Sequence, residues 1–96
     1  MGISMGDKGS LLRRIVLDVD APSELEIIKL ANELGRITGV DAVYIKVEET
    51  DVGVLGLKVI MEGSLDFNDV KRVIEINGAV IRSIDEVSVG EYILKG

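Results

Sequence analysis

Hydrophobic residues recur with two different periods along this 96-residue chain, and together these periods predict the order of its elements. Four segments are dense in aliphatic residues or alternate apolar with polar positions, as strands do; they cover residues 11–19, 42–49, 55–61 and 79–87. Two others repeat their apolar residues every three or four positions, as helices do; they cover residues 23–37 and 67–77. The predicted order is strand, helix, strand, strand, helix, strand.

Capping residues place the ends of both predicted helices. Ser23 has Glu26 three positions later, the spacing of a capping box, and Asp66 is a second N-cap. Gly39 and Gly78 are predicted to close the two helices. The buried stripe of the second helix is predicted to comprise Phe67, Val70, Val73 and Ile74. That of the first is predicted to comprise Leu25, Ile28, Ala31 and Leu34, widened by Ile27 and Leu30.

This order of elements is typical of the ferredoxin-like α+β sandwich, βαββαβ. Right-handed crossovers put the first and third strands in the centre of a four-stranded antiparallel sheet, with both helices on one face. The second and third strands form a hairpin that turns at residues 50–53. Residues 1–10 are Gly-rich without periodicity and are predicted to be a flexible tail, whereas residues 11–96 form one domain.

Composition removes several chemistries. Cysteine and histidine are both absent, which excludes thiol nucleophiles, disulfides, imidazole bases and zinc sites, and leaves Ca²⁺ or Mg²⁺ held by oxygens as the possible metals. The formal net charge of −6 repels phosphate backbones and anionic membranes, so neither nucleic acid nor a membrane is expected as a partner. With no signal peptide or membrane span in the sequence, we expect a cytoplasmic protein.

Charged residues on the first and last strands of the predicted sheet are candidate ligand-binding groups. Arg13 and Arg14 open the first strand, and the last strand, antiparallel to it, carries Asp85 and Glu86 near its end. Opposite charges on neighbouring strands pair structurally, which is the ordinary interpretation. The alternative is a basic notch in which both arginines and Arg82 bind the carboxylate or phosphate of a small anionic metabolite.

A second candidate is acidic. Asp18 and Asp20 flank the end of the first strand, and Glu24 follows in the predicted first helical turn. Three carboxylates so close in sequence could hold Ca²⁺ or Mg²⁺. Carboxylates near a helix N-terminus are also favourable without an ion, because they complement the helix dipole. Capping and solvation are therefore the competing interpretation.

The C-terminal segment is more apolar than a small single chain requires. Beyond the last strand, Val89, Tyr92, Ile93 and Leu94 form a strand-like apolar tail. Exposed edges and tails of this kind are usually covered by a neighbouring chain. We expect a homo-oligomer joined through this segment and an edge strand, with folding back onto the same subunit as the alternative.

Four blocks of sequence resemble a known family. They are Leu12–Val19 followed by Pro22, Gly39–Val43, Glu62-Gly63 with Leu65–Phe67, and Ile81–Val87 with Gly90. In this order and spacing they resemble the archaeal domain of unknown function 211 family. The resemblance implies an archaeal source, a ferredoxin-like fold and a tendency to form homo-oligomers, and it implies no activity. The chain has Arg82 where the family commonly has histidine, so no role of that histidine transfers here.

These observations favour a non-enzymatic homo-oligomeric module that binds a small anionic ligand or a hard metal ion at its subunit interfaces. Two alternatives remain open. One is an enzyme, or an enzyme subunit, that uses carboxylates with a divalent ion. The other is a purely structural assembly unit. No serine has a histidine to activate it, and no phosphate-binding glycine loop precedes a helix in the chain.

Overall fold

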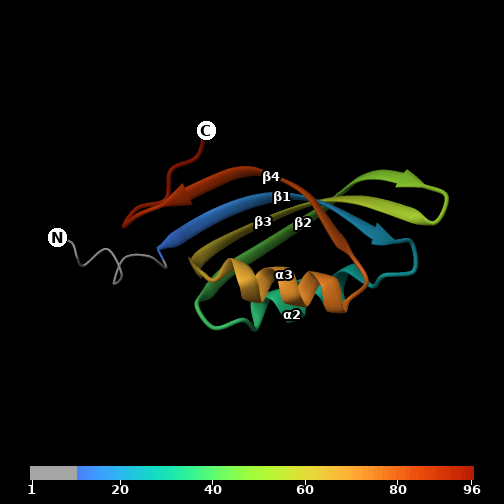
Figure 1. Cartoon of the computed structure of the whole chain (residues 1–96), viewed down its shortest axis with the longest axis horizontal. Helices are drawn as coiled ribbons and strands as arrows, with labels where there is room; N and C mark the ends of the chain where they lie inside the picture. The colour runs from blue at the N-terminus through green and yellow to red at the C-terminus, as the bar shows by residue number, and fades with distance from the viewer. Residues whose placement is uncertain (1–10) are drawn as a thin grey trace.

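The computed structural model describes residues 11–96, and these form one antiparallel sheet with two helices packed on one face (Figure 1). The predicted tail, residues 1–10, lies outside the described residues. The elements are β1 (Leu12–Pro22), α2 (Ile27–Gly35), β2 (Val40–Asp51), β3 (Val54–Leu65), α3 (Phe67–Ile76) and β4 (Val80–Val89). The strand order is β2-β3-β1-β4, which confirms the predicted ferredoxin-like sandwich.

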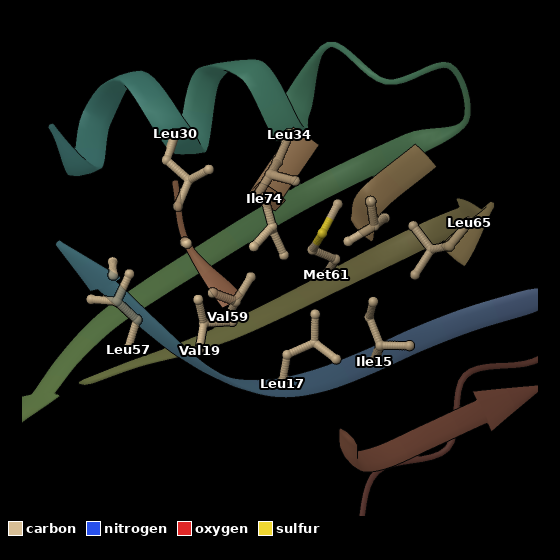
Figure 2. Close-up of a cluster of buried hydrophobic side chains, with 13 residues drawn as sticks. Ile15, Leu17, Val19, Leu30, Leu34, Leu57, Val59, Met61, Leu65 and Ile74 are labelled. Carbon is tan, nitrogen blue, oxygen red and sulfur yellow. The ribbon is translucent and has the colours of Figure 1, made fainter. Parts of the chain in front are cut away.

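The core lies between the sheet and the helices. Alternate residues of the two central strands point toward the helices, as the period of a strand requires. They meet Leu30 and Leu34 of α2 and Val70 and Ile74 of α3, all of which are fully buried (Figure 2). The strand residues of this core are Ile15, Leu17, Val19, Ala21, Leu57, Val59, Met61 and Leu65. Neither helix has the length and apolar run that crossing a bilayer takes.

The first helix begins later than the capping box predicts. β1 continues to Pro22, because its last residues still pair with the start of β3. Ser23 then donates its N–H to the Gly53 carbonyl at the hairpin turn and is not an N-cap. The helix starts at Ile27, and its N-cap, Glu26, makes no side-chain capping bond. The local capping signal was thus outweighed by sheet pairing.

The turn of the helix, about 3.6 residues, sets which residues of α2 are buried, and it puts Ile28 on the side away from Leu30. Ile28 is 78% exposed, so its predicted place in the core stripe is wrong, whereas Leu30 and Leu34 define the buried face. The helix ends at Gly35 with Arg36 as C-cap. Gly39, predicted to close the helix, instead turns the chain into β2 with a φ of +94°. The second helix matches its prediction, since Asp66 accepts hydrogen bonds from the N–H groups of Asn68 and Asp69.

A polar cluster joins the two helices. The Asn77 amide donates to the Glu33 carboxylate and to the Val73 carbonyl, each at 2.8 Å, and Lys29 lies 3.3 Å from the Glu33 carboxylate. The hydrogen bond from Asn77, supported by Lys29, lowers the pKa of Glu33 below its ordinary value. The charged form of Glu33 is thus favoured in the folded protein.

This cluster predicts a pH dependence of stability. A carboxyl group whose pKa is lowered on folding stabilises the protein above its unfolded-state pKa, and that contribution is lost as the pH falls through the folded-state value. We expect the melting temperature of the wild type to fall more steeply than that of Glu33→Gln between about pH 6 and about pH 3. Thermal unfolding followed by circular dichroism measures both. Parallel curves would contradict the assignment.

Candidate functional site

The face of the sheet away from the helices carries a largely buried arginine. Arg14 lies on this face, with its side chain only 12% exposed, between Glu86 of β4 and Glu62 of β3. It forms an ion pair with Glu86, and its Nε lies 3.3 Å from the Glu62 carboxylate without hydrogen-bond alignment. The ordinary interpretation of the sequence, an ion pair between the start of β1 and the end of β4, describes this arrangement. Arg14 thus binds two carboxylates of its own chain.

The other arginines of the predicted notch lie elsewhere. Arg13 donates to the Ser64 hydroxyl at 3.1 Å, and Arg82 forms an ion pair with Asp20 at 2.7 Å. That contact raises the pKa of the Arg82 guanidinium above its ordinary value. Asp85 accepts a hydrogen bond from the Ser83 hydroxyl. The structure therefore does not bring the three guanidinium groups together, and anion binding there stays a prediction.

The predicted acidic site is also divided between different places. Asp18 lines a groove of about 450 Å³ on the open sheet face, whereas Asp20 pairs with Arg82. Glu24 lies in the turn before α2, in a separate hollow that also includes Lys29. Within residues 11–96, no three acidic side chains are grouped as a metal ion would need. Binding of Ca²⁺ or Mg²⁺ by these three residues stays a prediction.

Sequence reasoning missed the groove itself. Its charged lining comes from all four strands: Asp18, Glu48, Glu49, Lys58 and Asp85. The alternation of polar residues along the strands was the available signal, but the neighbours across strands depend on register. Four carboxylates around one ammonium group produce a negative potential. The groove therefore favours cations over anions.

β4 leaves three aliphatic side chains uncovered on the side of the sheet that carries the helices. In the register with β1, Val87 lies opposite Ile15, and Ile84 lies opposite Leu17. Directly opposed residues share a face, so both point to the same side as the core. They are nevertheless 62% and 51% exposed, and Val89 at the end of the strand is 66% exposed. We call Ile84, Val87 and Val89 the β4 stripe. It extends the apolar face of the sheet beyond the part that the helices cover.

Residues 91–96, here called the C-terminal arm, turn back on the chain after β4. Gly90 donates its N–H to the Leu11 carbonyl, Leu94 donates its N–H to the Ser88 hydroxyl at 2.9 Å, and Lys95 lies 3.2 Å from the Glu62 carboxylate. Tyr92 and Leu94 stay more than three-quarters exposed. The arm thus contacts its own subunit, as the alternative interpretation proposed; Ile93 is partly buried, while Tyr92 and Leu94 remain exposed.

A four-stranded ferredoxin-like sandwich with an open sheet face and an uncovered edge defines the structural class of this protein. Comparison with known proteins identifies the family within this structural class. Residues 13–96 match the model of the DUF211 family, described as "Uncharacterized ArCR". The chain is 41% identical over 85 residues to the uncharacterized protein MJ0319 of Methanocaldococcus jannaschii. The aligned residues make up 88% of each of the two chains. The chain belongs to the DUF211 family, which confirms the resemblance seen in the sequence.

Proposed function

We propose that this protein is a non-enzymatic module that assembles with copies of itself along β4. The β4 stripe is the observation that carries this proposal. Burying apolar surface stabilises an interface by about 25 cal/mol per Å². Three aliphatic side chains on one edge strand, each at least half exposed, therefore favour a covered edge over a solvated one.

The two edges of the sheet differ in a way that supports the choice of β4. Among residues 11–96, each edge strand has a single neighbour in the sheet, so its outer N–H and C=O groups face away from the strands described and can pair with another chain. Both edge strands carry exposed charges, so charge does not distinguish them. On the helix side of β2, however, Val43 and Ile45 pack against the core. β4 instead combines its open edge with the β4 stripe, so a second copy is better accommodated there.

The proposal predicts that a charge in the β4 stripe breaks the assembly. In native mass spectrometry we expect the wild type above the single-chain mass of 10.4 kDa and Val87→Lys at that mass. Burying an unpaired ammonium group at an interface costs several kcal/mol, which lowers affinity by about a thousandfold or more. The same spectra test the predicted ligand, because a retained ion or metabolite adds its own mass.

A matched control separates interface loss from a general effect of charge. Val52 is 97% exposed at the tip of the β2–β3 hairpin, so Val52→Lys adds the same charge far from the β4 stripe. This variant should keep the wild-type mass, and both variants should keep the wild-type circular dichroism spectrum. A wild type found only at the single-chain mass at micromolar concentration would overturn the proposal.

A further inference from the structure

The C-terminal arm is held on its own subunit by a few polar contacts and by the partly buried Ile93. It crosses to the side of the sheet away from the helices (Figure 1), where Leu94 bonds to Ser88 and Lys95 pairs with Glu62. Lys95 is 61% exposed at its side chain, so its ion pair is weak in water. The exposed apolar side chains of the arm add little to this docking. The attachment is therefore weak for a segment of six residues whose ordering costs conformational entropy.

The docking site is nevertheless well formed. Ser88 is buried, with 6% of its surface exposed, although it is polar, and its hydroxyl accepts the Leu94 N–H. Glu62 is held in place by Arg14, which is itself largely buried. A hydroxyl acceptor and a carboxylate at fixed positions are complementary to an N–H donor and an ammonium group one residue apart. The arm of any copy of this chain carries that pair.

Gly90 provides the point about which the arm can turn. Its φ of +128° is a conformation that side-chain-bearing residues rarely adopt, and it directs the arm back over the sheet. Rotation to an extended φ costs glycine little and would carry the arm away from its own subunit. Because Gly90 directly follows β4, an extended arm leaves the subunit at the edge where the β4 stripe is exposed.

We propose that the arm is exchanged between subunits, so that Leu94 and Lys95 of one copy bind Ser88 and Glu62 of a second copy. This inference rests on the proposed assembly along β4. The contacts are those seen within one chain, transferred between chains, as in domain swapping. An arm that crosses from one subunit to the next also brings Tyr92 and Leu94 to the β4 edge, where they can be buried. The occupant of the docking site in the assembly is thus the arm of a neighbour.

Zero-length cross-linking of an isotopically mixed assembly tests the exchange. A carbodiimide joins an ammonium group and a carboxylate in contact as an amide, with loss of water, and so reports the Lys95–Glu62 pair directly. Equal amounts of ¹⁴N and ¹⁵N protein are unfolded together, refolded and cross-linked. We expect about half of the cross-linked products to join a Lys95 peptide of one isotope to a Glu62 peptide of the other isotope. Lys95→Gln should abolish this peptide, and Lys46→Gln should leave it.

The outcomes distinguish this inference from the proposed function. Cross-linked peptides with a single isotope throughout, or no Lys95–Glu62 peptide at all, would overturn arm exchange, while an oligomeric mass in the native spectrum would leave assembly along β4 standing. A native spectrum containing only the single-chain mass would overturn both. Mixed-isotope peptides together with an oligomeric mass support both.

Discussion

Gly63→Ala is expected to destabilise the protein by about 3–5 kcal/mol, a large share of the stability of a small domain. A Cβ at Gly63 would lie 2.3 Å from the Gly39 carbonyl oxygen and 2.6 Å from the Asp41 nitrogen. These are backbone atoms of the adjoining strand and its preceding turn, so they cannot move aside as a flexible side chain could. The φ of +143° adds backbone strain for alanine. Urea unfolding measures the loss.

Gly53→Ala is the matched control for this substitution. Gly53 also has a positive φ, of +77°, but a Cβ there would meet no atom within 4 Å. Only the backbone strain applies, which costs about 1–2 kcal/mol. A similar loss of stability in both variants would show that close packing at Gly63 is not the cause. A larger loss for Gly63→Ala than for Gly53→Ala would indicate that the family blocks around Gly39 and Gly63 serve close backbone packing and not a chemical function.

Leu17→Ala is expected to cost about 2–5 kcal/mol, because it leaves a cavity in the centre of the core. Leu17 is fully buried on β1, and its cross-strand neighbour Ile84 is half exposed. Ile84→Ala should therefore cost less than about 1 kcal/mol in a single chain. Chemical denaturation at several protein concentrations measures both variants. A concentration-independent loss as large for Ile84 as for Leu17 would contradict the division between core and β4 stripe.

The same pair of variants also bears on the assembly. Where a second copy covers the β4 stripe, the midpoint of unfolding rises with protein concentration, because association stabilises the folded state by mass action. Ile84→Ala should reduce that dependence, whereas Leu17→Ala should lower the midpoint at every concentration. Two residues that face each other across adjacent strands thus report separately on folding and on association.

One ion pair on the open face of the sheet could be predicted from the sequence. The order of the elements alone predicts that β1 and β4 are antiparallel neighbours. This relation places Arg14, at the start of β1, near Glu86, at the end of β4. The alternative arrangement, a notch of Arg13, Arg14 and Arg82, is not formed, because Arg82 lies far from Arg14 along the register and pairs with Asp20. The pairing of β1 with β4 shifts register between Val16 and Leu17 and again between Asp18 and Val19. These shifts decide which charged residues of β4 meet β1, and no local pattern in the sequence indicates them.

Element types and their order were determined by the sequence itself. Aliphatic periodicity is a local property, and so is the Asp66 cap, which the structure keeps. The start of α2 and the packing of Gly39 against Gly63 were decided only by the tertiary structure. Each depends on pairing between distant strands, whose many hydrogen bonds and buried contacts together outweigh a single local cap. The uncovered β4 stripe has the same origin, because only the placement of the helices determines which apolar residues they cover.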